Sequence, residues 1–398
     1  MAFSVLPSLI YPFHLFLSSN LRGTSITSFV IPNGVAEVAG WVFYGCTSII
    51  SITVPETVQN IGDCACEDCV NLASINIPNG VKEIGSNAFS GCANLASLTI
   101  PKGVTKIGKG AFHGCALLSS IIIPVVVDRI REDMFSACTS LVSAPIPEGV
   151  HGIGARAFMG CTSLISITVP ESAEEVGESA FEDCVSLTSV TIREGVTKIG
   201  RHAFKGCTAL ASIVIPEGVI VIGAGAFMDC EELASITIPK SAEEIGEGAF
   251  AACSLLSSIT IPEGVNWISD YAFSNCESLV SVPIPEGVYG IGDGAFMGCT
   301  ALLSITVPES AEEIGESAFE DCTSLVSATI PEGVTEIGEE AFASCVSLVS
   351  IVLPSFVETV EDAHTISGCA SLTIRPSLKG VTIFFFWETG LETIEEED

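Results

Sequence analysis

A unit of 23 residues repeats through most of this chain, and it constrains the fold more than any other feature of the sequence. The unit is clearest in Pro285–Val307, which reads PEGVYGIGDGAFMGCTALLSITV. About fifteen such units follow one another along the chain. A unit this short cannot bury its apolar face alone, so it has to stack on its neighbours in a solenoid. The repeat therefore predicts a single elongated body made of stacked coils.

Apolar residues recur at fixed positions within each unit, counted here from its proline as position 0. In the unit that starts at Pro285, Val288 and Ile291 stand at +3 and +6, and Leu302 stands at +17. Cysteine occupies +14 in fourteen successive units, and phenylalanine occupies +11 in twelve successive units from Phe89 to Phe342. Stacking would turn each of these positions into a buried column, and contacts between neighbouring coils would supply the stability.

The local pattern of one unit predicts its secondary structure. Leu302–Val307 ends in the alternation of apolar and polar residues that is typical of a half-buried strand. Pro308 ends that strand because proline cannot donate to a continuing ladder. A second extended stretch ends at Gly292, and Asp293–Gly298 is long enough for only one helical or 3₁₀ turn. With parallel strands about 4.8 Å apart, the coils would form a right-handed curved rod about 70 Å long.

The consensus L-x-S-I-x-I-P-x-x-V-x-x-I-G-x-x-A-F-x-x-C resembles the BspA-type leucine-rich repeat, over roughly residues 21–375. The resemblance implies a leucine-rich-repeat-like solenoid that binds proteins or mediates cell-surface adhesion and has no common enzymatic activity. The asparagine ladder of many leucine-rich repeats is missing from this chain. Other contacts in the turns must therefore take its place.

We expect three segments, with a solenoid at 21–375 between two irregular ends. Residues 1–20 do not fit the repeat, and a degenerate cap, a cleaved signal peptide or a mispredicted gene start would each explain them. Residues 376–398 are expected to form a C-terminal cap and an acidic tail. Within them Val381–Trp387 is apolar enough to cover the last coil, and the alternative is an exposed association site. The compartment stays open, because only the family resemblance points to secretion or the cell surface.

Hydrophobic residues make up 48% of the chain, a share that would also fit a membrane protein. No uninterrupted apolar run reaches the roughly 18 residues of a spanning helix, so we expect no membrane span. The apolar residues are instead accounted for by the buried columns of the solenoid.

The chain has 17 cysteines, and the stacked ones are expected to be free. Neighbouring coils would hold their Cβ atoms somewhat farther apart than the roughly 3.8 Å that a disulfide favours. A buried thiol packs as a small apolar group with a weak S–H donor, and a redox or metal role is the alternative. Cys64, Cys66 and Cys69 lie close together, with Cys66 in the phenylalanine position. Such a cluster allows a metal site or a local bridge, but a smaller core residue is the favoured interpretation.

The formal net charge is −33, and it is concentrated in the second half of the chain. Residues 206–398 carry 31 acidic and three basic side chains, whereas residues 1–205 carry 17 acidic and 12 basic ones. Nucleic acid is not an expected partner, because phosphate contacts need clustered lysine and arginine. A basic protein or divalent cations suit the C-terminal half better. We expect the protein itself to be a monomer.

Four basic residues of one unit form a candidate partner-binding site, which we call the basic island: Arg193, Lys198, Arg201 and Lys205. The alternative is a solvated surface that lowers self-repulsion. Residues 143–204 and 281–342 are nearly identical in sequence. They are offset by 138 residues, which indicates that a block of the chain was duplicated. Where the first copy has Arg193, Lys198 and Arg201, the second has proline and two glutamates. The two copies would therefore attract different partners.

The strands would also present a regular hydroxyl surface. Positions +19 and +21 lie on one side of a strand because they are two residues apart. Serine stands at +19 in fifteen successive units, from Ser28 to Ser350, and threonine at +21 in eight. Strand propensity and lateral hydroxyl contacts explain this pattern, and the alternative is recognition of a periodic ligand such as ice or a polysaccharide. The candidate residues for that ligand are Thr168, Thr191, Thr237, Thr260, Thr306 and Thr329.

No catalytic pattern is present, so we expect neither an enzyme nor a cofactor. The five histidines stand in separate units and none accompanies a recurring nucleophile or carboxylate. The paired glutamates lack the ligand spacing and glycine turn of an EF-hand loop. The sequence therefore favours a non-enzymatic interaction scaffold, and a structural array for a repetitive ligand is the second hypothesis.

Overall fold

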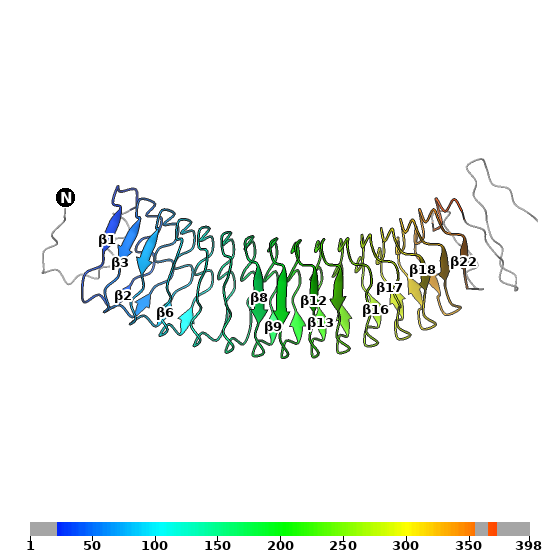
Figure 1. The fold of residues 1–398 in the computed structure, drawn as a ribbon, viewed down its shortest axis with the longest axis horizontal. Coiled ribbons are helices and arrows are strands. Elements are labelled where there is room, and N and C mark those ends of the chain that lie inside the picture. Colours follow the sequence, from blue (N-terminus) through cyan, green and yellow to red (C-terminus); the bar gives the residue numbers. More distant parts are fainter. Residues whose placement is uncertain (1–21, 355–364, 372–398) are drawn as a thin grey trace, which may run out of the picture. The chain divides into compact units, whose positions relative to one another are not determined.

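The computed structural model describes residues 22–354 and 365–371, and the chain divides into two compact units, Met1–Leu187 and Thr188–Asp398. Figure 1 shows the same repeated coil in each unit. The predicted N-terminal segment 1–20 and the predicted cap and tail at 376–398 lie outside the described residues.

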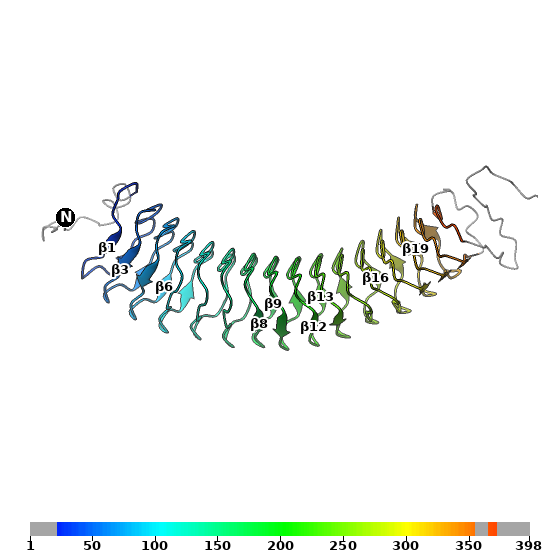
Figure 2. The same cartoon turned by 45° about the horizontal axis from the view of Figure 1, so that its top comes forward.

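Each coil contributes up to two short strands, one beginning at +19 and one of two residues at +5 and +6. Figure 2 shows the two sets of strands on different sides of the coils. In the first unit the strands at +19 are β1 (Ser28–Val30), β3 (Ser51–Thr53), β5 (Ser74–Asn76) and β8 (Ser166–Val169). The strands at +5 are β2 (Glu37–Val38), β4 (Asn60–Ile61), β6 (Glu83–Ile84), β7 (Lys106–Ile107) and β9 (Glu175–Val176).

The second unit repeats this arrangement. Its strands at +19 are β10 (Ser189–Ile192), β12 (Ser212–Val214), β14 (Ser235–Thr237), β18 (Ser304–Thr306), β20 (Ser327–Thr329) and β22 (Ser350–Val352). Its strands at +5 are β11 (Lys198–Ile199), β13 (Val221–Ile222), β15 (Glu244–Ile245), β16 (Trp267–Ile268), β17 (Gly290–Ile291), β19 (Glu313–Ile314) and β21 (Glu336–Ile337).

Within each unit the paired strands run in parallel with a register of one repeat. Ser28 pairs with Ser51 and Ser51 with Ser74 in the first unit. Ser304 pairs with Ser327 in the second unit. The predicted stacking of equivalent residues is therefore confirmed, and the fold is a parallel β-solenoid.

The core consists of the predicted columns. From Phe89 to Phe181 and from Phe204 to Phe342, the rings stack on their neighbours within each unit, with centroids 5.0–5.8 Å apart. These rings are fully buried, as are the cysteines and leucines of the same coils. Near-parallel rings at this separation are offset stacks, an arrangement that aromatic pairs favour.

Glycine at +7 allows the coils to approach closely. The Gly108 N–H donates to the Ile84 carbonyl of the preceding coil, and a Cβ on Gly108 would lie 2.3 Å from the Ser86 nitrogen. In the second unit a Cβ on Gly246 would lie 2.5 Å from the Ala224 nitrogen. Real Cβ atoms do not approach backbone so closely, so any other residue would push the coils apart.

Besides the coil that starts at Pro32, where Ala39 takes this position, two coils depart from this rule, and the strand pairing changes there. Arg131 and Ser269 replace the glycine at +7 and do not make its backbone hydrogen bond to the preceding coil. The Ser269 hydroxyl donates to the Ile245 carbonyl instead, at 2.6 Å. Among the described residues of the first unit the +5 sheet ends at β7, and in the second unit β16 begins a new sheet after β15.

The strands at +19 are missing from the same regions. Among the described residues, only isolated bridges join Ser120 to Ser143 and Ser258 to Ser281. One coil of each bridged pair has proline at +21, Pro145 or Pro283, which has no N–H to donate. The expectation of one strand in every coil was therefore wrong in these places.

The predicted helical turn around Ala-Phe is also different, since no helix occurs among the described residues. The Ser90 N–H donates locally to Asn87, but the Phe89 N–H donates to Ala111 in the next coil. Left-handed residues at +9 and +13, with φ of 52° at Asn87 and 70° at Gly91, interrupt any helical path. The turn is thus built from hydrogen bonds between coils, which the sequence of one unit does not reveal. Within these ranges there is likewise no apolar helix long enough to cross a bilayer.

Candidate interaction surfaces

The cysteine column is a structural replacement for the missing asparagine ladder. The Cys115 thiol donates to the Phe89 carbonyl and the Cys253 thiol to the Phe227 carbonyl, both at 3.2 Å. The same bond recurs along both units, from one coil to the coil before it. Burial raises the pKa of Cys276 to about 12, so this thiol keeps its proton at neutral pH. The column cysteines are free and inaccessible, as a packing role requires.

The cysteine cluster of the second coil is also free and buried. Cys66 takes the phenylalanine position, and its carbonyl accepts the Cys92 thiol at 3.2 Å. A hydrogen bond between the side chains of Cys66 and Cys69 lowers the pKa of Cys69 and raises that of Cys66. Across the described residues no three His, Cys, Asp or Glu side chains are arranged to hold a metal ion. The geometry is that of core residues.

The hydroxyl surface exists but is interrupted. All six candidate threonines are exposed, and Thr306 pairs in register with Thr329. Thr260, however, lies outside the named strands. Between these threonines, position +21 carries Val214, which is 66% exposed, and Pro283. A ligand with a strict repeat would meet breaks in the hydroxyl rows of the second unit.

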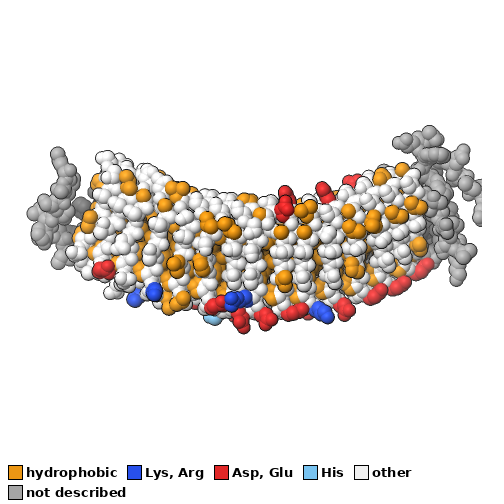
Figure 3. All heavy atoms as spheres, in the orientation of Figure 1, with side chains coloured by type: hydrophobic (Ala, Val, Ile, Leu, Met, Phe, Trp, Pro, Cys, Tyr) orange, Lys and Arg blue, Asp and Glu red, His pale blue; other side chains and the backbone are white. Residues whose placement is uncertain are grey.

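An apolar stripe runs beside the hydroxyls at position +18, and the sequence analysis missed it. Val280, Leu303, Val326 and Val349 belong to four successive coils of the second unit and are 42–49% exposed. Hydrophobic side chains are visible on this face of the second unit in Figure 3. The signal was present in the repeat, because +18 carries a large apolar residue in these four successive coils, whereas the four coils before them carry threonine, alanine or serine there.

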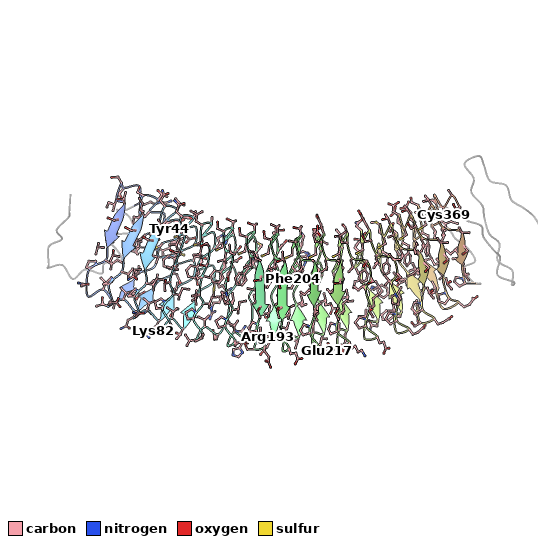
Figure 4. All side chains as sticks on the ribbon, in the orientation of Figure 1. Tyr44, Lys82, Arg193, Phe204, Glu217 and Cys369 are labelled. Carbon is pink, nitrogen blue, oxygen red and sulfur yellow. The ribbon has the colours of Figure 1, made fainter. Side chains whose placement is uncertain are left out.

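The structure brings only part of the basic island together. Arg193, Lys198 and Arg201 are exposed. Lys205 is half-buried and is separated from Arg201 by the buried Ala203 and Phe204. Arg193 lies on the lower rim in Figure 4, and Phe204 lies inside the coil. The island is therefore a line of cations that follows one coil around the solenoid rather than a compact patch.

Ion pairs neutralise several basic side chains of the first unit. Lys109 Nζ lies 2.6 Å from Glu132 Oε2, and Arg156 lies 2.8 Å from Glu132 and 2.9 Å from Asp133. The hydrogen bond from Lys109 holds the pKa of Glu132 below its usual range, with Arg156 adding to the effect. Lys106 pairs with Glu83 in the same way. These basic side chains reduce repulsion among acids of neighbouring coils.

The second unit has a continuous acidic column at +8. Some of these carboxylates also have a structural role, because Asp270 accepts the Asp293 N–H at 3.0 Å and Asp293 accepts the Glu316 N–H at 2.8 Å. The sequence analysis noted the paired glutamates but not this column, which appears only when the coils are aligned. Its members are Glu247, Asp270, Asp293, Glu316 and Glu339.

Known proteins share this repeat and this fold. A family profile described as "BspA type Leucine rich repeat region (6 copies)" matches residues 18–142, 128–256, 243–373 and 289–396. A leucine-rich repeat protein from Bacteroides ovatus is 30% identical, with a TM-score of 0.80 over 88% of this chain and 92% of its own. A leucine rich cell surface protein from Faecalibacterium prausnitzii is 28% identical, with a TM-score of 0.53 over 82% and 88%.

A more distant leucine-rich repeat protein from Eubacterium ventriosum shares the fold, at 19% identity and a TM-score of 0.50 over 89% of this chain and 91% of its own. A search of curated proteins finds no match. The comparisons therefore rest on the family profile and on solved structures.

Proposed function

Because the chain belongs to the BspA-type leucine-rich repeat family, we propose that it is a non-enzymatic scaffold that binds proteins at the cell surface. One observation carries the proposal: the core columns are constant, whereas the exposed positions of the coils change in charge from coil to coil. At +5 of the second unit, Lys198 is followed by Val221 and then by Glu244 in paired strands. Such variation on a rigid support suits the recognition of different protein surfaces.

The surface location is supported by a relative. The protein from Faecalibacterium prausnitzii that shares 28% of its residues with this chain is described as a cell surface protein. The net charge of −33 fits partners that carry basic patches, since opposite charge speeds encounter and selects partners.

A structural array that binds a repetitive ligand through the threonines is the weaker proposal. The in-register pairing of Thr306 with Thr329 favours it. The interruptions at Val214 and Pro283 weaken it, because a lattice ligand needs an unbroken repeat of contacts.

Two variants of the full chain separate these functions. An edge variant replaces all four residues of the basic island by glutamate: Arg193→Glu, Lys198→Glu, Arg201→Glu and Lys205→Glu. A face variant carries Thr191→Tyr, Thr237→Tyr and Thr260→Tyr. Each protein is immobilised, and captured proteins and polysaccharides are quantified under the same salt conditions.

The proposal predicts that the edge variant loses acidic partners that the wild type and the face variant retain. Loss of polysaccharide or ice binding in the face variant alone would support the array instead. Identical capture by all three proteins would eliminate the basic island as a binding site. Thermal unfolding of both variants serves as the control for folding.

A further inference from the structure

Two aromatic side chains meet on neighbouring coils of the second unit, at positions +5 and +4 of the repeat. Trp267 lies in β16, and Tyr289 precedes β17 directly. Their ring centroids are 5.3 Å apart, and Tyr289 is 47% exposed. The whole chain has three tryptophans and four tyrosines, and the first unit carries another such pair, Trp41 and Tyr44, whose ring centroids are also 5.3 Å apart.

The indole of Trp267 lies against the backbone of the next coil. Trp267 pairs in register with Gly290, and a Cβ on Gly290 would be 1.9 Å from Cζ3 of the indole. Only glycine leaves room for the ring in this place. One side of the half-buried indole therefore lies against backbone, which restrains the ring and lowers the entropy lost when it binds a ligand.

Carboxylates border this pair on the adjoining coil. The Glu312 N–H donates to the Tyr289 carbonyl at 2.8 Å, and Glu313 pairs in register with Gly290. Glu336 pairs with Glu313 one coil farther on. All three glutamates are exposed, and none of them takes part in an ion pair within the described ranges. The aromatic pair thus stands next to negative charge that no cation of this part of the chain neutralises.

We propose that this aromatic–acidic surface (Trp267, Tyr289, Glu312, Glu313 and Glu336) binds an arginine-bearing, basic segment of a partner protein. A guanidinium stacks on an indole face and at the same time donates to carboxylates in fixed directions. Tryptophan, tyrosine and arginine are also the residues that dominate binding energy at protein interfaces. This inference rests on the proposed function, because it specifies the chemistry of one partner and the place where it binds.

Coils of the first unit that lie 138 residues earlier in the chain supply a matched control. In the equivalent coils of the first unit, Arg129 and His151 take the places of Trp267 and Tyr289. Gly152 again follows at +5, with Arg129 Nη1 3.6 Å from the position of a Cβ on it. The Glu174 N–H donates to the His151 carbonyl at 3.1 Å, as Glu312 does to Tyr289. The equivalent positions therefore carry an arginine and a histidine where the second unit has a tryptophan and a tyrosine.

The test is calorimetric titration of the full chain with two synthetic peptides, Arg-Gly-Arg-Gly-Arg and Lys-Gly-Lys-Gly-Lys, at physiological salt. The wild type is expected to bind the arginine peptide more tightly. The Trp267→Ala/Tyr289→Ala variant, which leaves the charge unchanged, should weaken that binding by about tenfold and change lysine-peptide binding much less. Equal affinity of this variant and the wild type for the arginine peptide would overturn the proposal.

A second variant guards against a folding defect. Trp267→Arg/Tyr289→His introduces the residues that the equivalent coils already carry, so it should fold, as thermal unfolding will show, and it should lose arginine-peptide binding. The converse variant, Arg129→Trp/His151→Tyr, should add a second binding site for the peptide. A stacking site would be contradicted if a substitution at an unrelated position abolished arginine-peptide binding. It would also be contradicted if the wild type showed no preference for the arginine peptide over the lysine peptide.

These outcomes are independent of the test of the proposed function. Failure of the Trp267 variants to alter peptide binding leaves partner capture through the basic island unaffected. Conversely, the edge variant can capture the same proteins as the wild type without any consequence for the site at Trp267. The peptide titration alone decides whether that site prefers arginine.

Discussion

At the scale of single residues, cysteine at +14 combines two properties that no other small side chain has. It packs as an apolar group between the stacked phenylalanines, and its S–H donates to the phenylalanine carbonyl of the preceding coil, as from Cys299 to Phe273 at 3.2 Å. Alanine would leave that buried carbonyl with one bond fewer. The repeated cysteine is thus explained by packing and hydrogen bonding together.

Because these thiols are buried as neutral groups, stability should fall steeply in alkali. Burial raises the pKa of Cys230 and Cys276 from the ordinary 9.0 to about 12. Below pH 9 the folded and unfolded chains both hold the protons, so the full stability is present. Between pH 9 and 12 only the unfolded chain releases them, and each thiol should lower the free energy of unfolding by about 1.4 kcal/mol per pH unit.

Urea unfolding at pH 8, 9, 10 and 11 measures how steeply the free energy of unfolding falls with pH. The Cys276→Ala variant should be less stable than the wild type at pH 8, and its free energy of unfolding should fall less steeply above pH 9, by about one proton, so the difference should narrow as pH rises. The same slope in the variant and the wild type would show that the thiols do not control alkaline unfolding.

At the scale of the structural element, glycine at +7 sets the pairing between coils. The Gly246 N–H donates to the Ile222 carbonyl, and β15 pairs with β13 beside it. Where serine stands instead, at Ser269, that bond is absent and the sheet is interrupted between β15 and β16. At this step the added side chain of serine coincides with the end of one sheet and the start of the next.

Gly246→Ala should destabilise the second unit by about 3 kcal/mol, because its Cβ would meet backbone at 2.5 Å. Gly287→Ala is the matched control, since the nearest atom to its Cβ is a carbonyl oxygen at 3.4 Å. We expect that change to stay within about 1 kcal/mol. Chemical denaturation of both variants measures the difference, and similar effects would refute the close-approach argument.

At the scale of the whole molecule, a solenoid should tolerate the removal of one coil but not of half a coil. Deleting 217–239 joins Pro216 to Lys240 and keeps every column in register, so Phe204 would stack on Phe250. Deleting 217–228 removes a little over half a repeat and sets the core positions out of register. Because stability comes from contacts between neighbouring coils, we expect only the variant that lacks 217–239 to fold.

Circular dichroism and thermal unfolding of the two deletion variants provide the measurement. The one-coil deletion should keep the spectrum per residue and lose a modest part of its stability. Cooperative unfolding of the half-coil deletion at the wild-type temperature would contradict the dependence on register.

The sequence by itself determined the repeat, the stacking register and the identity of the core columns. This was possible because Phe89, Cys92 and Leu95 recur at a constant step, and only stacking buries all of them. The tertiary structure decided what depends on neighbouring coils: the thiol bonds to phenylalanine carbonyls, the breaks in the sheets and the turns without a helix. The position of Trp267 on Gly290 belongs to the same class, because these residues are 23 positions apart and meet only when the coils stack.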